Sequence, residues 1–381
     1  MYRKKACELK TKRVVVKIGS SSLTHSSGVL SIEKLKDHSE AIAHLMDQNV
    51  EVVLISSGAV SAGFRQIGYV SRPVTVAGKQ AAAAVGQGLL IEAYNHVFKQ
   101  HGYTTAQLLL TRDNFSEEIQ FSNIYQTITE LLKRGVIPII NENDSVAIEE
   151  LTFGDNDMLS ALVSGLVNAD ALIMLTDING IYDKNPNDFR DAKRYNKIDY
   201  ISDQMIQATS QNAGSKQGTG GMKSKLMAAQ MATTLGVKCF IGKDDGVDKL
   251  VRILNGTGDG TYVGDQHLPH VRKHKQWLAF HSTPKGKIYI DQGAKKALLS
   301  RGKSLLAAGI VAVENQFIQD DVVEICSDEQ VIAKGQVNYS AEQIERVRGL
   351  SSEEAMEITG CKKPEIIHRN KLIISIEEEQ K

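Results

Sequence analysis

Residues 13–24 read RVVVKIGSSSLT, in which a mostly apolar run at 13–18 leads into a glycine and three serines. A short apolar run of this kind is typical of a strand that is buried on both faces of a sheet. Three more runs share this character, namely EVVLIS at 51–56, VIPII at 136–140 and ALIMLTD at 171–177. TTAQLLLT at 104–111 and VKCFIG at 237–242 predict two further strands, and helix-like segments occupy 31–49, 79–101, 116–134 and 155–168. This alternation predicts an α/β fold in which helices cover both faces of a mainly parallel sheet.

The composition of the chain changes after residue 263, which predicts a second domain. Residues 264–280 carry three of the ten histidines and the only tryptophan, without a clear period. Beyond them, short β-like runs alternate with one helix pattern. We therefore expect a large α/β domain at residues 1–265, a linker at 266–281, a small, mostly β domain at 282–365 and a tail at 366–381.

Charge and hydrophobicity argue against several classes of protein. The chain has 45 basic and 45 acidic residues, and this balance disfavours a protein whose main task is to coat nucleic acid or an anionic membrane. No apolar run approaches the roughly 18 residues of a membrane span, and no apolar core follows the basic N-terminus, as a secretory signal requires. The cysteines lie far apart, at Cys7, Cys239, Cys326 and Cys361, which favours reduced thiols over a disulfide framework or a zinc site. These features predict a cytoplasmic protein.

Polar residues stand at the carboxyl ends of four predicted strands, where parallel sheets bind their ligands. The stretch SSGAVSAG (56–63) follows the second strand, NENDSVA (141–147) follows the fourth, and Thr-Asp (176–177) ends the fifth. In the first strand, Lys17 places an ammonium group beside the backbone N–H groups of the loop that begins at Gly19. This is an anion site in outline, although a lysine that extends from a strand end into solvent would give the same pattern.

The stretch NAGSKQGTGGMKSK at 212–225 holds four glycines and three lysines, directly before a helix pattern that begins near Met222. Glycines let the backbone approach an anion closely, and the helix offers its N-terminal amides. Lys223 and Lys225 stand at the same helix end, where a cation opposes the helix dipole unless a bound anion offsets it. We therefore favour a phosphate-binding loop over a mobile linker. The stretch has neither P-loop nor G-x-G-x-x-G spacing, and the nearest P-loop match, at 302–304, lacks the first glycine.

Asp155, Asn156 and Asp157 stand together at the start of a predicted helix, in the stretch GDNDMLSALVSGLV. Asp and Asn are preferred helix N-caps, which would explain one of the three. Together with Asp144 they would also form an acidic and amide cluster that binds a substrate ammonium group, holds Mg²⁺ or orients the lysines. The residues alone leave capping and function equally open.

Six motifs, in this order, resemble those of the amino-acid kinase family. They are VVVKIGSSSLT, LISSGAVSAG, PIINENDSVA, FGDNDMLSALV, LTDINGIY and GTGGMKSKLMAA. The resemblance is closest to members that phosphorylate glutamate, and it covers nearly the whole chain because the segment from about Ser282 resembles a PUA domain. It implies a three-layer αβα sandwich around a mainly parallel, eight-stranded sheet, followed by the PUA-like domain.

Carried over position by position, the resemblance implies roles for these polar residues. Lys17 and Lys225 would flank the transferred γ-phosphoryl group, and Asp157 would orient both lysines. The glutamate site would consist of Ser57, Asp144 and Asn156, with Asn141 and Asp155 close by. The ATP site would consist of Lys17, Thr176, Asp177 and the run Thr219, Gly220, Gly221, Met222, Lys223, Ser224 and Lys225. Mg²⁺ would bridge phosphate oxygens, without a protein ligand that the sequence identifies.

Comparison with the family also separates the parts of the glycine-rich stretch. Lys225 is the catalytic candidate, whereas Lys216 and Lys223 would attract the nucleotide or face water. The glycines at 214–218 would form the hinge on which the following run closes. The chain departs from the family at Asn185, where relatives often have Asp before the proline, and residues 1–10 form an extension that we expect to be solvated.

The implied reaction is ATP-dependent phosphorylation of the side-chain carboxylate of L-glutamate to L-glutamyl 5-phosphate, the first step of proline biosynthesis. That carboxylate is ionised at pH 7, so the transfer needs alignment and cations rather than a general base. The resemblance also implies feedback inhibition by proline, at a site that overlaps residues 57–63 and 141–147. It further implies a homo-oligomer, either a dimer or a tetramer, and transfer of the product to a glutamyl-phosphate reductase.

Two alternatives remain open. Other acid-phosphorylating members of the family act on N-acetylglutamate or aspartate, but aspartate-specific members typically begin with K-F-G-G where this chain has K-I-G-S, and an N-acetylated substrate has no ammonium group for Asp144. The PUA-like domain also allows an RNA-binding or RNA-modifying protein. Its basic residues are largely balanced by Asp320, Asp321, Glu324, Asp328 and Glu329, and we find no basic, aromatic stacking face. Nucleic acid and membranes are therefore not expected to be main partners.

Overall fold

The computed structural model describes residues 12–146, 156–184, 186, 188–211, 219–264, 278, 282–328 and 330–374. The chain divides into two compact units, one made of Met1–Asp113 and Asn123–His270 and the other of Asn114–Ser122 and Val271–Lys381. Most of the linker predicted at 266–281 lies outside the described residues, so the predicted domain boundaries stay predictions. None of the described helices is long and apolar enough to cross a membrane.

The first unit is built on a large sheet. Its strands are β1 (Arg13–Ile18), β2 (Glu51–Ser56), β3 (Thr105–Leu110), β4 (Ile137–Glu142), β5 (Ala171–Leu175), β8 (Lys197–Ile198), β9 (Lys238–Gly242) and β10 (Gly260–Val263), while β6 (Ile181–Tyr182) and β7 (Arg194–Tyr195) form a separate pair. The eight strands lie in the order β3-β4-β2-β1-β5-β9-β10-β8, and neighbouring strands are parallel except β9 and β10. The predicted eight-stranded, mainly parallel sheet is therefore confirmed.

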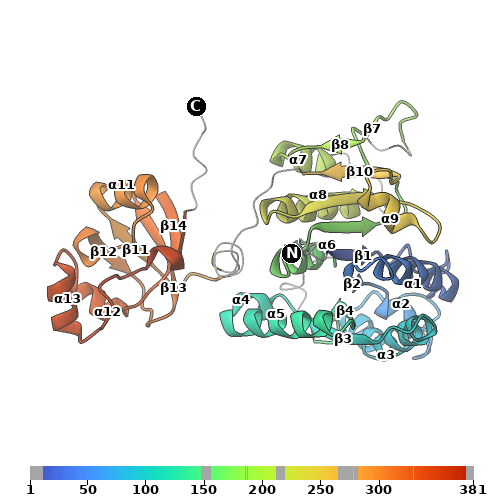
Figure 1. Cartoon of the computed structure of the whole chain (residues 1–381), viewed down its shortest axis with the longest axis horizontal. Coiled ribbons are helices and arrows are strands. Elements are labelled where there is room, and N and C mark those ends of the chain that lie inside the picture. The colour runs from blue at the N-terminus through green and yellow to red at the C-terminus, as the bar shows by residue number, and fades with distance from the viewer. Residues whose placement is uncertain are drawn as a thin grey trace, which may run out of the picture. The chain divides into compact units, whose positions relative to one another are not determined.

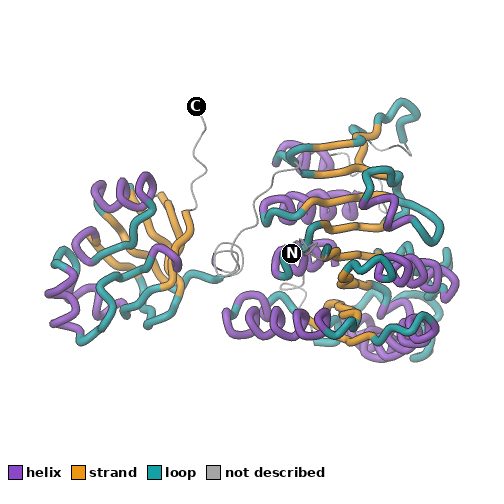
Figure 2. The backbone as a smooth tube through the Cα atoms, viewed as in Figure 1, coloured by secondary structure: helices purple, strands orange, loops and turns teal. Residues whose placement is uncertain are grey.

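Helices cover both faces of this sheet. The helices of this part of the chain are α1 (Ile32–Met46), α2 (Ala59–Gly63), α3 (Val76–Gln100), α4 (Asp113–Ser116), α5 (Glu118–Lys133), α6 (Asn156–Leu166), α7 (Asp203–Gln211), α8 (Thr219–Thr234) and α9 (Lys249–Leu254). Most of α4 and the start of α5 belong to the second unit. On one face α1 contacts α3 and α9, and on the other α6 contacts α8 (Figures 1 and 2). Because α6 also packs on four central strands and α1 packs on β2, the unit has three layers, and the predicted αβα sandwich is confirmed.

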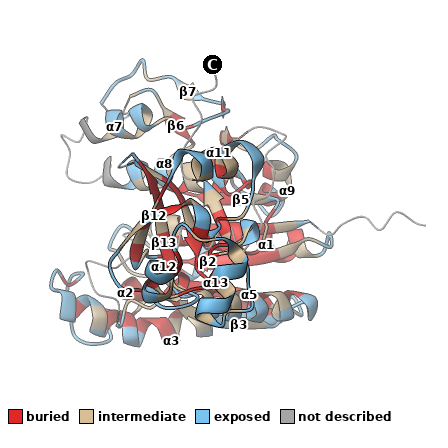
Figure 3. Ribbon diagram, turned by 90° about the vertical axis from the view of Figure 1, so that its left-hand side faces the viewer, coloured by how far each residue is buried: buried red, intermediate tan, exposed pale blue. Residues whose placement is uncertain are grey.

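Burial on both faces explains why the strands could be predicted from apolar runs. In β1 and β2 every residue except the first is buried, and Figure 3 shows the central strands as buried between helices with exposed outer surfaces. β4 continues two residues beyond its predicted end, because Asn141 and Glu142 extend the ladder opposite Leu109 and Leu110 of β3. Asn141 therefore lies inside a buried strand rather than in the loop after it.

Two helices begin earlier than their apolar patterns predict. α3 starts at Val76 instead of residue 79, because the Thr75 side chain caps it by accepting a hydrogen bond from the Gly78 N–H at 3.2 Å. α8 starts at Thr219 instead of near Met222, so the run predicted to cover phosphates forms the first turns of this helix.

A close approach of backbones holds α2 against α3. A Cβ atom on Gly86 would lie 1.8 Å from the Ala59 carbonyl oxygen, and one on Gly63 would lie 2.0 Å from the Ala82 carbonyl oxygen. No side chain fits at either glycine. The turn between β2 and α2 also needs a glycine, since Gly58 has a φ of 108°. These glycines fix the turn that carries Ser57 relative to α3.

The second unit contains a five-stranded sheet in the order β12-β11-β13-β14-β15. Its strands are β11 (Gly286–Ile290), β12 (Ile310–Glu314), β13 (Val322–Ser327), β14 (Gln330–Gln336) and β15 (Leu372–Ile374), and its helices are α11 (Gln292–Arg301), α12 (Ala341–Val347) and α13 (Ser352–Thr359), with short 3-10 turns at Ala307–Gly309 and Arg369–Lys371. Buried residues such as Ile288, Val323 and Tyr339 form a separate hydrophobic core. The unit is mostly β, as predicted.

Two details of this unit bear on the sequence analysis. Gly302 ends α11 in the left-handed conformation, with a φ of 55°, so the 302–304 match closes a helix where a P-loop would open one. α12 and α13 each begin with a capping box, at Ser340 and Ser351, and this sequence signal was not used to predict them.

Candidate active site

One buried carboxylate joins two lysines from different elements. Asp157, in the first turn of α6, has its Oδ1 atom 2.5 Å from Lys17 Nζ and its Oδ2 atom 3.0 Å from Lys225 Nζ. Lys17 belongs to β1 and Lys225 to α8, and the three side chains are 2%, 0% and 13% exposed for Lys17, Asp157 and Lys225. The structure thus brings together all three residues predicted to be catalytic.

The first turns of α8 complete this cluster. Ser224 Oγ donates to Asp157 Oδ2 at 3.0 Å, and Lys225 Nζ donates to the Gly221 carbonyl oxygen at 3.3 Å. A Cβ atom on Gly19 would lie 3.6 Å from Lys17 Nζ, so the ammonium group lies directly against the backbone of the loop after β1. Lys223 is exposed on the same turn, and the predicted hinge at 214–218, together with Lys216, lies outside the described residues.

The charge of this cluster suits an anion. Two ammonium groups contact the Asp157 carboxylate, and their positive potential attracts anions. The N-terminal end of α8, which carries partial positive charge, adds to the same potential. A phosphate group bound here would interact favourably with the two ammonium groups and with the N-terminal end of α8.

A second, neutral cluster lies next to the charged one, because Asn156 precedes Asp157 at the start of α6. Asn156 Nδ2 donates to Ser57 Oγ at 2.8 Å and to Asn141 Oδ1 at 2.9 Å. Asn141 Nδ2 in turn donates to Gln87 Oε1, on α3, at 2.9 Å. The structure thus joins three of the residues predicted to bind substrate into one chain of hydrogen bonds, and adds Gln87, which the sequence analysis did not identify.

Two other residues predicted to bind substrate stand apart from this chain. Asp144 follows β4 and is half-buried, and burial raises the pKa of its carboxyl group, while the positive charge of Arg72 opposes the shift. Among the described residues, Asp144 has no hydrogen bond to Asn156 or Ser57. Asp155 lies outside the described residues.

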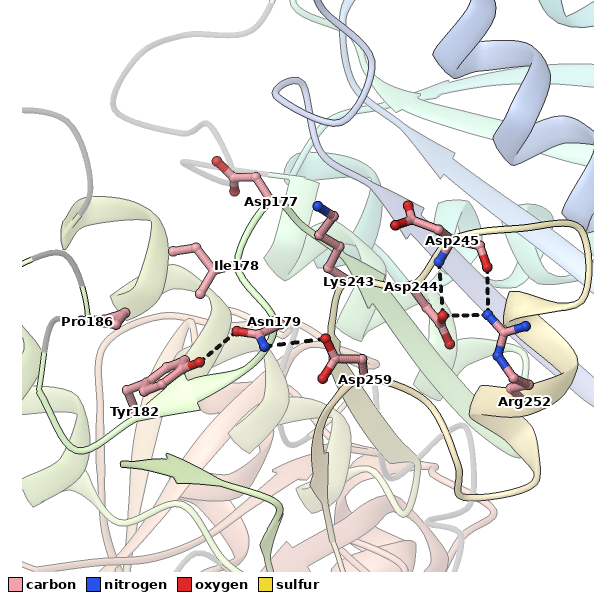
Figure 4. A pocket seen from close by; sticks show the side chains of 10 residues that line it. All are labelled: Asp177, Ile178, Asn179, Tyr182, Pro186, Lys243, Asp244, Asp245, Arg252 and Asp259. Atoms are coloured by element: carbon pink, nitrogen blue, oxygen red, sulfur yellow. Dashed lines mark hydrogen bonds and ion pairs between the residues drawn. The ribbon is translucent and has the colours of Figure 1, made fainter. Parts of the chain in front are cut away.

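A cavity of about 580 Å³ opens beyond the ends of β5 and β9 (Figure 4). Asp177 lines it, and the neighbouring Thr176, buried at the end of β5, donates a hydrogen bond to Asp177 Oδ1 at 3.1 Å. The Tyr182 hydroxyl donates to Asn179 Oδ1 at 2.7 Å on its wall. Its other lining residues are Ile178, Pro186, Lys243, Asp244, Asp245, Arg252 and Asp259. Of the two predicted residues, Asp177 therefore borders a space that is large enough for part of a nucleotide, and Thr176 lines the smaller cavity next to it.

A smaller cavity of about 430 Å³ shares Asp177 and Lys243 with the first. It reaches the loop after β1 at Ser21 and Ser22, and His38 of α1 lines it. Burial and the charge of Lys249 lower the pKa of His38 to about 4, so this imidazole is neutral at pH 7. The strand-end rule that identified Thr176 and Asp177 would also have identified Lys243, which directly follows β9.

The side chains at this site fit a nucleoside triphosphate better than a metal ion that is held by protein ligands alone. Among the described residues, no group of three His, Cys, Asp or Glu side chains could hold a metal ion. The buried carboxylate of Asp157 already contacts two ammonium groups. Mg²⁺ often binds through substrate phosphates and retained waters with one or two carboxylates, so these residues are compatible with a metal that arrives with the nucleotide.

Comparisons with known proteins agree with this geometry. Residues 12–243 match the model of the amino acid kinase family, and residues 286–359 match the PUA domain model. The chain is similar to glutamate 5-kinase 1 of Bacillus licheniformis, with 54% identity over 95% of this chain and 98% of that protein. It is also similar to the glutamate 5-kinase of Geobacillus kaustophilus, with 54% identity over 95% of this chain and 97% of that protein.

Proposed function

The chain belongs to the amino acid kinase family, and from this premise we propose that it transfers the γ-phosphoryl group of ATP to the side-chain carboxylate of L-glutamate. The product is L-glutamyl 5-phosphate, and the reaction is the first step of proline biosynthesis. The relatives at 54% identity support the substrate. The observation in the structure that carries the proposal is the buried Asp157 carboxylate between Lys17 and Lys225, next to the amide of Asn156.

The two lysines would act on the transferred group. Both reactants are anions, since a glutamate carboxylate is ionised at pH 7 and the triphosphate is negatively charged. Phosphoryl transfer through a loose transition state needs alignment and charge neutralisation rather than a general base. Asp157 holds both ammonium groups in place, so no reorganisation is needed when charge develops on the phosphoryl oxygens.

The amide cluster would bind glutamate. Ser57 Oγ accepts a hydrogen bond from Asn156, so its own proton can be donated to a substrate carboxylate. The buried Asn156 Oδ1 atom has no hydrogen-bond partner among the described residues and can accept from the substrate ammonium group. The carboxyl group of Asp144, in its ionised form, would supply a counter-charge for that ammonium group.

The nucleotide would bind with its phosphates at Lys17 and the first turns of α8, and with its nucleoside in the cavity beside Asp177 (Figure 4). Mg²⁺, when bound to the phosphates, would neutralise part of their charge. In this arrangement Lys17 and Lys225 hold the γ-phosphate end, Thr176 and Asp177 border the nucleoside, and the acceptor lies toward Asn156.

A comparison of three substrates tests the proposal. ADP release would be measured with glutamate, N-acetylglutamate and aspartate under the same conditions. We expect glutamate to give the largest kcat/KM, because N-acetylglutamate lacks the ammonium group and aspartate is one methylene shorter. Activity on either of the others that equals the activity on glutamate would overturn the choice of substrate.

We further propose that the enzyme works in the cytoplasm as a homo-oligomer, passes its product to a glutamyl-phosphate reductase and is inhibited by proline. Proline shares the α-carboxylate and the charged amine of glutamate, so the same groups near Ser57 and Asp144 would bind it. Inhibition by proline that is competitive with glutamate is the expected result. Inhibition that is competitive with ATP instead would place the proline site elsewhere.

A further inference from the structure

Gln87 is a buried polar residue on a helix that is otherwise packed against the core. It lies on α3 and is 9% exposed, and its Oε1 atom accepts a hydrogen bond from Asn141 Nδ2 at 2.9 Å. Leu90 and Tyr94, three and seven residues further along α3, are fully buried on the same face. A buried amide in such surroundings is unfavourable unless it is hydrogen-bonded. Breaking the hydrogen bond to Asn141 would leave the buried Gln87 amide unpaired, which is unfavourable.

The directions of the hydrogen bonds in the amide cluster follow from two backbone groups, the Glu142 N–H and the Ser56 carbonyl oxygen, which accepts from Asn156 Nδ2 at 3.3 Å. The Glu142 N–H, which can only donate, points to Asn141 Oδ1 at 2.9 Å. Asn141 must therefore present its oxygen on this side and its Nδ2 group to Gln87. Gln87 must therefore accept this hydrogen bond with its Oε1 atom, since two facing N–H groups would repel each other. This reasoning assigns the amide orientations without any choice between N and O atoms.

The same logic continues to Asn156. Because Asn141 Oδ1 is an acceptor, Asn156 must present Nδ2 to it, at 2.9 Å, and the same Nδ2 group donates to Ser57 Oγ at 2.8 Å. The Asn156 Oδ1 atom is left buried without a hydrogen-bond partner among the described residues. An acceptor of this kind favours a ligand that carries an N–H or ammonium donor.

We propose that Gln87 is a positioning residue that selects substrates with a free α-ammonium group. It tethers Nδ2 of the Asn141 side chain, whose orientation the Glu142 N–H sets, and so holds Asn141 Oδ1 in place against Asn156. The proposal rests on the proposed function, because it concerns the glutamate site of that reaction. Gln87 itself does not touch the substrate in this scheme. Its backbone is held in place by the contact of Gly86 with Ala59, where a Cβ atom would lie 1.8 Å from the carbonyl oxygen.

The test compares glutamate with glutarate, which has both carboxylates but no ammonium group. In Gln87→Met, Asn141 Nδ2 loses its acceptor, so the Asn141 side chain is held only at its oxygen and supports Asn156 less firmly. We expect KM for glutamate to rise about tenfold, as for one buried polar group left unpaired. The inhibition constant of glutarate, measured in competition with glutamate, should change less than about twofold, since glutarate does not use Asn156 Oδ1.

Two further variants control for stability and for the loss of any buried hydrogen bond. Gln87→Glu keeps an acceptor oxygen at the same place, and it should retain the wild-type ratio of glutamate KM to glutarate inhibition constant. Tyr94→Phe removes a hydroxyl group that lies 2.8 Å from Ser56 Oγ, two turns away on the same helix face, and it should leave the ratio unchanged. This variant separates an effect on the amide chain from a general effect on α3.

Each outcome decides the proposal. Constants for glutamate and glutarate that rise together in Gln87→Met, or that both stay at the wild-type level, would overturn it. If Gln87→Met does not fold, a Gln87→Glu variant that has lost discrimination would overturn it, and one that keeps discrimination would support it. A wild-type protein without activity on glutamate would overturn the proposed function and this inference with it, whereas the variants alone decide the role of Gln87.

Discussion

Asn156 and Asp157 are neighbours in the chain but belong to two different regions of the site. Asp157 lies in a charged cluster with Lys17 and Lys225, and Asn156 lies in a neutral cluster with Ser57 and Asn141. The start of α6 places one side chain in each. The charged region lies where negative charge would be transferred, and the neutral region lies where the acceptor would be chosen. We therefore expect changes in the first to lower kcat and changes in the second to raise KM for glutamate.

The physical reason for this division is the different cost of burying charges and amides. A buried ion cluster is stable only with its counter-charges in place, so it can hold the phosphoryl group strongly but discriminates little by shape. Amides have distinct donor and acceptor ends, so a fixed chain of them recognises a ligand by the direction of its hydrogen bonds.

The largest effect should follow from removing a lysine of the charged cluster. Lys17→Ala and Lys225→Ala should each lower kcat by about 10³-fold, because an ammonium group that contacts the transferred group in the transition state is lost. Asp157 keeps one ammonium partner in either variant, so the fold should remain intact by circular dichroism. Steady-state kinetics with ATP and glutamate would give the two constants.

Lys223 provides the matched control, since it stands on the same turn of α8 as Lys225 but is exposed. Lys223→Ala should change kcat less than about threefold, as for an exposed charge. Near-normal turnover of Lys17→Ala or Lys225→Ala would remove that lysine from the mechanism and with it the distinction between the two regions.

The sequence predicted the charged region better than the neutral one, for a physical reason. Lys17 interrupts an apolar strand and Lys225 opposes a helix dipole, so each residue conflicts with its local pattern and is visible in the sequence. Gln87 sits in an ordinary helical run, and its partner Asn141 is 54 residues away. A contact between residues so far apart in the chain leaves no periodic pattern in the sequence. Only the fold, which brings the end of β4 next to α3, shows the contact between Asn141 and Gln87.

The fold shows the same contrast. β1 and β2 were predicted to the residue because strands that are buried on both faces are mostly apolar. The end of β4 was missed because Asn141 and Glu142 are polar, and only their pairing with β3 makes them part of the strand. The early start of α3 depends on the Thr75 cap, a side-chain contact that apolar periodicity does not report.

Asp144→Asn should give the next largest effect and tests the part of the site where the acceptor would bind. Loss of the counter-charge should raise KM for glutamate about thirtyfold, as for a hydrogen bond to a charged group, with a smaller change in kcat. Because burial raises the pKa of Asp144, the carboxyl group favours folding below its ordinary pKa and loses that contribution as pH rises through the raised value. Above the raised pKa the ionised form therefore opposes folding relative to the protonated form.

Asparagine carries no such penalty, so Asp144→Asn should melt at pH 7 at the same temperature as the wild type or higher, while binding glutamate more weakly. Differential scanning calorimetry at pH 7 would show this. A clear drop in melting temperature would mean that the carboxylate has a stabilising partner in the folded chain, and the weaker binding could then be a consequence of local unfolding.

The smallest effect is expected at Lys243. It lines both cavities but belongs to neither the charged nor the neutral cluster. It is exposed and has no ion pair with another described residue, so its ammonium group can reach a bound nucleotide from the solvent side. Lys243→Gln should raise KM for ATP about three- to fivefold, because a solvent-screened charge contributes roughly 1 kcal/mol or less. KM for glutamate should stay constant.

Lys238, exposed at the opposite end of β9, is the control, and Lys238→Gln should change neither constant. A rise in KM for glutamate but not for ATP in Lys243→Gln would mean that the nucleoside does not bind in the cavity of Figure 4.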